Sequence, residues 1–418
     1  MTSTGALGGH PPERSAIELI ERVDLDAASR ALDGGVVRTP TIDCPELGRL
    51  TGSPVALKAE SLQVTGSFKL RGALSRIAAL GEPPEAGLVT ASAGNHGRAV
   101  AAAARLRGLR CEVFMPHEAA VSKVLAVEAL GAHVTLQGAS VDEALELALK
   151  RGGESGAAFV HPFDDLDVIA GQGTLALELL DEVPDLARVI VPVGGGGLAS
   201  GVGIALRRAS RKVELIGVQA LACAPYADAL ADRRVRSATE ATIADGIAIK
   251  RPGELTLPLL RELLDEVRTV PEDEIAAGMV FLAEQAKLIA EGAGAVGVAE
   301  LMSGRLGPVS GTTVAIVSGG NVDSGLLAAL LLRHETEEGR RVRVFTRVPD
   351  RPGGLADLLG LVARTRANVV SVEHLREAVS LRVRETGVEL TLETRGPRHT
   401  EEVLATLAEG GYEASLGQ

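Results

Sequence analysis

Lys69 is the residue whose type and surroundings best suit covalent chemistry. It follows the small polar turn 65–67 (TGS) and opens an apolar run that continues through Ala73, Leu74 and Ile77. An amine at the start of a packed helix is poorly solvated, so its pKa should fall, and a deprotonated amine can attack a carbonyl carbon to form a Schiff base. The alternative is a surface lysine that packs its aliphatic stem and keeps its amine in water. Taken alone, the stretch 67–73 (SFKLRGA) favours that alternative.

Three glycine-rich turns reverse that preference. They are 92–97 (SAGNHG), 194–198 (GGGGL) and 318–321 (SGGN), and each is expected between a strand and a helix. In a parallel sheet such turns lie at the carboxyl edge of the strands, where ligands bind, and the free N–H groups of a helix N-terminus favour an anion. Four consecutive glycines can wrap closely around a phosphate because they lack Cβ atoms. The alternative for the glycine loop is a tight turn without a ligand.

A dinucleotide site is a rival interpretation of the glycine loop. The pattern Gly194-x-Gly196-x-x-Ala199 fits a loosened dinucleotide fingerprint, and Glu214 follows about 20 residues later. However, Glu214 is expected at the beginning of the next strand, whereas an acid that binds ribose should stand at its far end, which is Gln219. No Gly-Lys-Ser/Thr follows the loop, and this excludes a P-loop.

Polar side chains in two of the turns could recognise a substrate or an aromatic ring. Ser92, Asn95 and His96 offer a hydroxyl, an amide and an imidazole, a set that suits a carboxylate together with a phenolate-like oxygen. In a cofactor pocket, Ser318 could donate a neutral hydrogen bond to a ring nitrogen. The alternatives are a left-handed turn residue for Asn95 and helix caps for His96 and Ser318.

The elements that must position these residues alternate along the chain. Short β-rich runs such as 88–90, 189–193 and 314–317 are separated by helical stretches rich in Ala and Leu. This alternation predicts parallel sheets with helices on both faces, which is an α/β fold. The apolar run 326–332 is expected to form a buried helix.

A different order of elements follows a charged linker at 333–341. Strands are expected at 341–346, 369–375, 386–395 and 412–416, and helices at 353–366 and 398–409. This strand-helix-strand-strand-helix-strand order predicts a ferredoxin-like βαββαβ domain that starts near residue 340.

Composition narrows the class of protein and its partners. The formal net charge of -12 argues against nucleic acid, whose phosphates would be repelled. No apolar stretch reaches the roughly 18 residues that span a bilayer, and the N-terminus has no signal-peptide pattern. Cys44, Cys111 and Cys223 are expected to be free thiols in a reducing compartment. We therefore expect a cytoplasmic protein that binds neither nucleic acid nor membrane.

Five motifs in order along the chain resemble those of the threonine dehydratase (threonine ammonia-lyase) family. They are 67–73, 92–96, 194–198, 242–248 (TIADGIA) and 318–321. Members of this family are pyridoxal-phosphate enzymes of the tryptophan-synthase-β-like fold type II, with two parallel-sheet α/β subdomains. The resemblance covers residues 15–335 and implies a catalytic domain there, in which a smaller subdomain at about 58–160 is inserted in the larger one. Residues 340–418 resemble a single ACT regulatory domain, with 349–353 (PDRPG) as its ligand loop.

The resemblance implies a role for each matched residue. Lys69 would bind pyridoxal 5'-phosphate as a Schiff base and later act as the base at the substrate Cα. Phe68 would pack against the cofactor ring, Asn95 would bind the ring hydroxyl, and Ser318 would face the ring nitrogen. The phosphate would be bound by Gly194, Gly195, Gly196, Gly197 and Leu198. Gly246 and Glu291 would lie near the cofactor, although Glu291 could instead be an acidic residue that leads a turn. The substrate would be bound by Ser92, Gly94, Asn95 and His96.

The implied reaction is β-elimination of L-threonine to 2-oxobutanoate and ammonia, with L-serine to pyruvate as a second activity. A neutral partner such as Ser318 would favour loss of the β-hydroxyl over reprotonation at Cα. Ala93 stands where similar serine racemases carry a serine acid/base, so racemisation should be weak. Those racemases also bind a divalent metal near the segment that matches 219–225, which has no carboxylate here, so no metal is expected.

The resemblance further implies an amino-acid effector, such as isoleucine or valine, and a homodimer or homotetramer. Three other functions stay open from the residues alone. A β-replacement enzyme of the cysteine-synthase type shares the fold, although the 242–248 motif and the ACT-like tail argue against it. The others are a nucleotide-linked dehydrogenase and an amino-acid sensor with an inactive catalytic domain, against which Lys69 argues.

Overall fold

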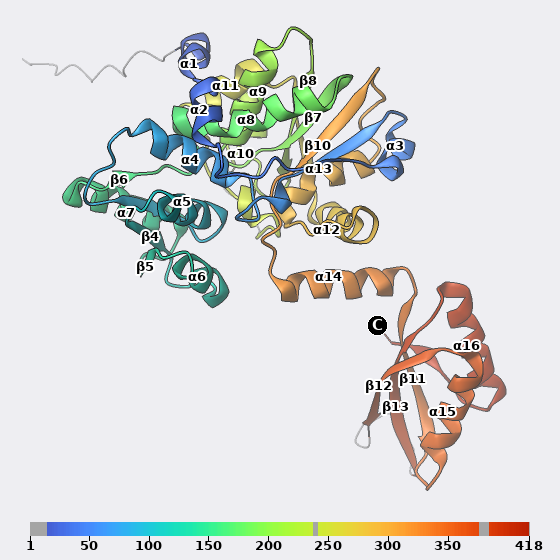
Figure 1. Ribbon diagram of the computed structural model, residues 1–418. Coiled ribbons are helices and arrows are strands. Elements are labelled where there is room, and N and C mark those ends of the chain that lie inside the picture. Colours follow the sequence, from blue (N-terminus) through green and yellow to red (C-terminus); the bar gives the residue numbers. More distant parts are fainter. Residues whose placement is uncertain (1–14, 237–240, 376–383, 418) are drawn as a thin grey trace, which may run out of the picture. The chain divides into compact units, whose positions relative to one another are not determined.

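The computed structural model describes residues 15–236, 241–375 and 384–417, and the chain divides into two compact units after Val322 (Figure 1). Two sheets form the scaffold of the first unit, and one sheet forms that of the second.

Six strands form the main sheet of the first unit, in the order β1-β2-β10-β7-β8-β9. The edge strand β1 is antiparallel to β2, and all the other neighbouring pairs are parallel. The bounds are β1 (Thr41–Asp43), β2 (Val55–Ala59), β7 (Leu186–Pro192), β8 (Glu214–Ala220), β9 (Glu266–Val270) and β10 (Thr312–Val317). Every residue of β2 and β10 is buried, as expected for parallel strands covered on both faces.

Helices pack on both sides of this sheet (Figure 1). The long helix α8 (Leu166–Glu182) packs against α9 (Gly197–Arg208), while α13 (Gly292–Met302) contacts β7, β8, β9 and β10. Aliphatic residues fill the core between them, including Ile169, Val189, Val202 and Ile316. The remaining helices of this part are α1 (Ala16–Arg22), α2 (Leu25–Ala31), α3 (Pro45–Thr51), α10 (Pro225–Leu230), α11 (Thr256–Leu263), α12 (Glu272–Phe281), and the short turns η1 (Glu60–Leu62), η2 (Asp245–Ile247) and η3 (Leu282–Ala286).

A smaller parallel sheet in the same unit has the order β5-β4-β3-β6. Its strands are β3 (Leu88–Ala91), β4 (Cys111–Met115), β5 (His133–Leu136) and β6 (Ala158–Phe159). Four helices accompany it, namely α4 (Lys69–Ala79), α5 (Asn95–Leu106), α6 (Val121–Glu128) and α7 (Val141–Ser155). Helix α5 carries six buried residues in succession from Ala99 to Ala104, and these small side chains let it pack closely against α4 and the strands.

Two of the three glycine-rich turns open a helix, as the sequence predicts, and the third does not. The turn after β3 leads into α5, and the turn after β7 leads into α9. After β10, however, the chain continues without a helix, and α14 (Ser324–Glu337) begins only after Asp323, whose carboxylate accepts hydrogen bonds from the amides of Gly325 and Leu326. Ser318 is therefore not a helix cap.

The second unit has the predicted βαββαβ order after α14. Its elements are β11 (Arg341–Pro349), α15 (Gly354–Thr365), β12 (Asn368–Leu375), β13 (Glu385–Glu393), α16 (Pro397–Glu409) and β14 (Ser415–Leu416). The strands form an antiparallel sheet in the order β12-β13-β11-β14, and α15 and α16 lie together on one of its faces (Figure 1). Val344, Leu390 and Leu358 are among the buried residues between sheet and helices. This is the ferredoxin-like arrangement.

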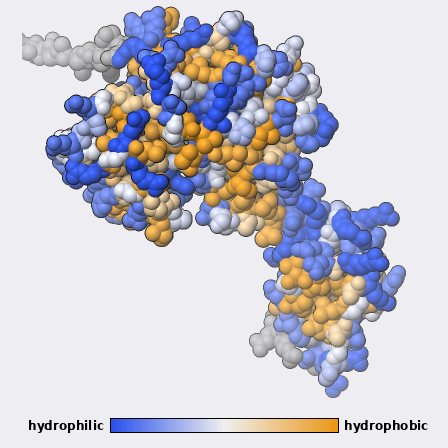
Figure 2. Space-filling view, viewed as in Figure 1, coloured by the Kyte–Doolittle hydropathy of each residue, from blue (hydrophilic) through white to orange (hydrophobic). Residues whose placement is uncertain are grey.

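Apolar side chains in the second unit are not all buried. The 326–332 run forms part of α14, but none of this helix's residues is buried, so the expectation of a buried helix was wrong. The space-filling view shows apolar side chains gathered on the visible face of the second unit (Figure 2). Val370, Val372 and Leu375, on the edge strand β12, are exposed by 37–41%. Among the described residues, no helix is both long and apolar enough to cross a membrane.

Candidate active site

Backbone hydrogen bonds hold the turn before Lys69 against the end of β10. The amide of Phe68 donates to the carbonyl of Ser318 over 3.1 Å, and the amide of Gly320 donates to the carbonyl of Gly66 over 2.9 Å. Ser67 and Gly319 pair as an isolated antiparallel bridge. Two stretches that are far apart in the sequence therefore meet at the carboxyl edge of the main sheet.

Lys69 is the first residue of α4 and is half-buried. Its Nζ donates a hydrogen bond to the carbonyl of Pro162 over 2.7 Å and lies 5.2 Å from the centre of the Phe68 ring. Burial lowers the pKa of the Lys69 amine to about 8, and the carboxylate of Glu291 opposes this shift only in part. With that pKa, roughly a tenth of the amines are neutral at pH 7 and able to act as nucleophile or base.

Asn95 is held by residues from two other segments. Its Nδ2 donates to Glu291 Oε1 over 2.6 Å, while its Oδ1 accepts a hydrogen bond from Asn321 Nδ2, also over 2.6 Å. Asn321 in turn accepts from Arg98 over 2.7 Å and donates to the carbonyl of Thr65 over 2.9 Å. The amide of Asn95 is thus fixed in orientation and keeps one Nδ2 proton for a ligand.

Glu291 is a buried carboxyl whose ionisation is perturbed. It is 6% exposed, and burial, followed by the nearby carboxylate of Asp245, raises its pKa to about 7. Asn95 opposes this shift by donating its hydrogen bond. At neutral pH the group is therefore close to half protonated, and it can either accept or donate a proton.

The substrate residues predicted from the 92–97 turn lie at the start of α5. Ser92 Oγ accepts a hydrogen bond from the amide of Gly94 over 3.0 Å, and a Cβ atom on Gly94 would meet no other atom within 4 Å. The His96 ring is buried, and its Nε2 lies 3.0 Å from the carbonyl of Val160. Burial, with Lys69 adding to it, lowers the pKa of His96 to about 3. The imidazole is therefore neutral, and its single N–H proton lies on Nε2, because the carbonyl of Val160 can only accept. Nδ1 is then an acceptor, so the ring has no donor left for a carboxylate.

The glycine loop has buried residues whose backbone donors have no protein partner. Gly196 has φ of 88° and caps α9, and Gly197 and Leu198 form its first turn. Within the described residues, the amides of Gly195, Gly196, Gly197, Leu198 and Ala199 donate to no protein acceptor. Buried amides without an acceptor are costly, and at a helix N-terminus they are suited to an anion. The loop thus meets the physical requirement of a phosphate site.

Four buried hydroxyls near these elements also lack a partner within the part of the chain that the structure describes. They are Ser61 Oγ, Thr65 Oγ1 and Ser67 Oγ, which precede Lys69, and Ser200 Oγ, in the first turns of α9. Ser318, at the end of β10, is 3% exposed, and its Oγ makes only a long contact of 3.4 Å to the carbonyl of Ala293. Gly246 lies in η2 and is close to Glu291: a Cβ atom on Gly246 would lie 3.5 Å from Glu291 Oε1. These groups could all serve a polar ligand.

The turn 161–165 (HPFDD) is a part of the site that the sequence did not reveal. Pro162 accepts the hydrogen bond of Lys69, and Phe163 packs so close to the glycine loop that a Cβ on Gly195 would meet its ring at 2.2 Å. His161 Nδ1 accepts hydrogen bonds from the amides of Phe163 and Asp164, which shapes the turn. A usable signal was its position directly after the short strand β6, at the ligand-binding edge of a parallel sheet.

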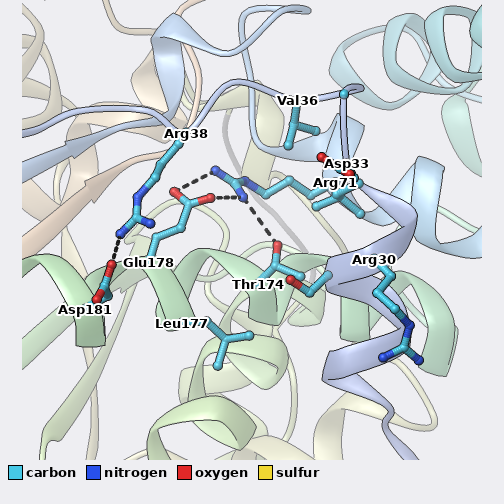
Figure 3. Close-up of a pocket in the computed structure, with 12 residues that line it drawn as sticks. Arg30, Asp33, Val36, Arg38, Arg71, Thr174, Leu177, Glu178 and Asp181 are labelled. Carbon is cyan, nitrogen blue, oxygen red and sulfur yellow. Dashed lines mark hydrogen bonds and ion pairs between the residues drawn. The ribbon is translucent and has the colours of Figure 1, made fainter.

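Arg71, two residues after Lys69 in α4, makes buried ion pairs with two other elements. Its guanidinium binds both oxygens of Glu60 at 2.8 and 2.9 Å and both oxygens of Glu178 at 2.6 and 3.1 Å. Lys58, also fully buried, pairs with Glu178 at 2.8 Å. Figure 3 shows Arg71 pointing toward Glu178 and Thr174 along a cavity of about 560 Å³. The donors of Arg71 are all engaged by protein groups, so we assign it a structural role.

Comparison with known proteins identifies the family. The sequence model of the family described as "Pyridoxal-phosphate dependent enzyme" matches residues 32–319. An L-threonine ammonia-lyase of Thermotoga maritima is 45% identical over 95% of this chain and 100% of its own length. An L-threonine ammonia-lyase of Geobacter sulfurreducens is 43% identical over 93% of this chain and 97% of its own. This chain belongs to the pyridoxal-phosphate-dependent enzyme family.

Solved structures support the same assignment. A threonine deaminase of tomato, Solanum lycopersicum, is 33% identical, with a TM-score of 0.69, over 77% of this chain and 89% of its own. A maize serine racemase is 34% identical, with a TM-score of 0.69, over 75% of this chain and 98% of its own. Both structures match about three quarters of this chain, whereas the Thermotoga maritima relative extends over nearly all of it.

The residues of the site fit pyridoxal phosphate. The glycine loop offers unpartnered amides for the phosphate, Lys69 offers a partly neutral amine for the aldehyde, and Asn95 keeps a donor. The dinucleotide interpretation has no such support, because Glu214 opens β8, as expected, and pairs with Arg188 over 2.6 Å. Among the described residues, no group of three or more His, Cys, Asp or Glu is arranged to hold a metal.

Proposed function

We propose that this enzyme is an L-threonine ammonia-lyase, which converts L-threonine to 2-oxobutanoate and ammonia and L-serine to pyruvate. The observation that carries the proposal is the match to two L-threonine ammonia-lyases over more than nine-tenths of the chain. The geometry agrees with it, because a half-buried amine with a pKa of about 8 stands at the start of α4, beside the carboxyl edge of the main sheet.

The site residues divide the work of the proposed elimination. When bound, pyridoxal phosphate withdraws electrons from the substrate Cα and makes its proton acidic. Lys69 would hold the cofactor through Nζ and then accept the Cα proton at the same atom. Ser92 and Asn95 would orient the substrate carboxylate, and Ser318 would give the ring nitrogen a neutral partner. A neutral partner favours loss of the β-hydroxyl over return of the proton to Cα.

Glu291 is our candidate for the acid that protonates the departing hydroxyl. It is buried and keeps its proton in about half of the molecules at neutral pH, since its pKa is raised to about 7. Ala93 carries no hydroxyl that could return a proton to the opposite face of Cα, so we expect racemisation to be weak.

The test is a product assay on the purified full-length chain loaded with pyridoxal phosphate. Threonine should yield 2-oxobutanoate, serine should yield pyruvate more slowly, and Lys69→Ala should yield neither. Absence of 2-oxobutanoate from threonine would refute the proposal. Faster turnover of O-acetylserine with sulfide would instead support the β-replacement alternative, and tight binding of threonine without product would support an amino-acid sensor.

We further propose that residues 340–418, within the second unit, form an ACT domain that regulates the enzyme. Its support is the ferredoxin-like order of elements and the loop 349–353, where Gly353, at φ of 92°, opens α15. Isoleucine or valine should change threonine turnover in the full chain, and Asp350→Ala should abolish that response without changing turnover in its absence. Turnover that neither amino acid alters would contradict this part of the proposal.

We also propose a homodimer or homotetramer that works in the cytoplasm. Strand β12 lies at the edge of its sheet, and Val370, Val372 and Leu375 on this strand are exposed, a pattern that suits pairing between subunits. All three cysteines are buried free thiols, which agrees with a reducing compartment. Light scattering of the purified chain tests the assembly, and a monomer at micromolar concentration would refute it.

A further inference from the structure

A cluster of hydroxyls lies beneath the glycine loop and is not explained by catalysis. Tyr226, at the start of α10, and Thr256, the first residue of α11, are both 0% exposed. Tyr226 Oη donates to the carbonyl of Gly195 over 2.7 Å, and Thr256 Oγ1 lies 2.9 Å from the same oxygen. The two hydroxyls lie 2.7 Å from each other. One backbone carbonyl therefore has two buried side-chain partners that come from different helices.

Further contacts fix these two hydroxyls in place. The amide of Gly253 donates to Tyr226 Oη over 3.0 Å, so the phenol both accepts and donates. Asp164 accepts the amides of Leu255 and Thr256, each over 3.0 Å, and so holds the start of α11. The loop also packs directly on the cluster, because a Cβ on Gly196 would lie 2.8 Å from Thr256 Cβ and 2.9 Å from Tyr226 Oη.

The geometry of the peptide bond gives this cluster a consequence. The peptide that joins Gly195 to Gly196 is planar and trans, so its N–H points away from its carbonyl oxygen. Because Tyr226 and Thr256 bind the carbonyl oxygen, the N–H of Gly196 must face the opposite side of the loop. Within the described residues, that N–H is one of the amides without a protein acceptor. A glycine peptide could otherwise flip at low cost, because glycine tolerates both signs of φ.

We propose that Tyr226 and Thr256 are positioning residues that fix the Gly195–Gly196 peptide with its N–H turned toward the cofactor phosphate. They touch neither substrate nor cofactor in this role, and they act by removing the competing orientation of the peptide before the phosphate binds. Asp164 supports them by holding α11. The inference rests on the placement of the phosphate at the glycine loop proposed above, but not on the identity of the amino-acid substrate.

The experiment compares two ligands that differ only in the phosphate. Apoenzyme of the full chain is titrated with pyridoxal phosphate and with pyridoxal, and both dissociation constants are read from absorbance. Tyr226→Phe removes a single hydroxyl and should weaken binding of pyridoxal phosphate about tenfold, the size expected for one lost buried hydrogen bond, while leaving pyridoxal unaffected. Thr256→Val should act in the same direction, and Thr256→Ser should restore the wild-type value.

Tyr412→Phe is the matched control, because Tyr412 is the only other tyrosine and lies in the second unit. It should bind both ligands like the wild type. The ³¹P resonance of the bound phosphate should shift in Tyr226→Phe but not in this control.

Equal affinity of Tyr226→Phe and wild type for pyridoxal phosphate would overturn the inference. An equal loss of affinity for both ligands would also overturn it, since that result indicates general damage to the pocket. If the wild type binds pyridoxal phosphate no more tightly than pyridoxal, the proposal that the glycine loop binds the phosphate is itself refuted. Tight binding of pyridoxal phosphate without 2-oxobutanoate formation would refute the proposed substrate and leave the inference intact.

Discussion

Removal of the Arg71 guanidinium should destabilise the catalytic unit far more than removal of a surface arginine. Arg71 is 1% exposed and makes paired contacts to Glu60, which is 0% exposed, and to Glu178. In Arg71→Leu, Glu178 keeps its contact to Lys58 at 2.8 Å, whereas Glu60 loses its cation and keeps the hydroxyl of Thr39 at 2.5 Å. A buried carboxylate deprived of its cation costs about 3–5 kcal/mol.

That cost can be converted into a change in melting temperature. A unit of about 320 residues has an unfolding entropy of about 0.7 kcal/mol/K, so 4 kcal/mol corresponds to about 6 °C. The control is Arg49→Leu, whose ion pair with Glu46 at 3.3 Å is exposed and should be worth less than about 0.5 kcal/mol. Calorimetry of the full chain follows the transition of the catalytic unit in both variants.

The double variant Glu60→Gln/Arg71→Leu separates a buried charge from a lost packing contact. Replacing the orphaned carboxylate with a neutral amide should recover roughly half of the lost stability, because only the cavity and the missing hydrogen bonds remain. If Arg71→Leu melts within about 1 °C of Arg49→Leu, the account of this network is wrong. If the double variant is no more stable than Arg71→Leu, the penalty arises from packing.

Three further perturbations test the site. Lys69→Ala should lose turnover and should no longer form a covalent adduct with pyridoxal phosphate on borohydride treatment, as read by mass spectrometry; a retained adduct on another residue would contradict its role. The pKa of Glu291 is raised from 4.5 to about 7, so the folded protein keeps a proton that the unfolded chain has released between these pH values. The contribution of Glu291 to stability should therefore fall by about 3 kcal/mol as pH rises through this window, opposite in sign to the contribution of buried His96, whose pKa is lowered. Glu291→Gln removes only the Glu291 contribution, so its urea midpoint should rise more steeply with pH than that of the wild type; equal slopes in both proteins would refute the assignment. Gly196→Ala places a Cβ at φ of 88° and 2.8 Å from Thr256 Cβ, so it should cost about 1–3 kcal/mol and weaken cofactor binding, whereas unchanged binding would mean that the loop relaxes freely.

The sequence predicted those parts of the site that are signalled locally. Lys69 precedes an apolar helical run, and the glycine loop follows a strand of buried residues, so residue type and spacing marked both. The βαββαβ order of the second unit was predicted for the same reason. Strands and helices differ in the spacing of their apolar residues, and this spacing can be recognised within each short segment. The roles of the individual site residues stay predictions until they are tested.

The parts that were missed depend on contacts across long stretches of chain. Asp164 meets Thr256 across 92 residues, and Tyr226 meets Gly195 across 31, and no local pattern marks either pair. The run in α14 was expected to be buried because its residues are apolar. Composition alone does not show whether other elements cover a helix, and none of the residues of α14 is buried. The late start of α14 could have been predicted, because Asp323 before a helical run is a good N-cap.

The turn 161–165 connects the amine of Lys69 with the glycine loop that we propose to bind the phosphate. Pro162 accepts the hydrogen bond of Lys69 Nζ, the next residue packs on Gly195, and Asp164 holds the start of α11 beneath that glycine. Consecutive Cα atoms are about 3.8 Å apart, so these three contacts cannot move independently. Pyridoxal phosphate carries its aldehyde and its phosphate ester on the same ring, so Lys69 and the glycine loop would have to stay within a limited distance of each other to hold both groups. The turn 161–165 contacts both Lys69 and the glycine loop, so it limits the distance between them directly. The two sheets limit this distance less directly, because helices and loops link them.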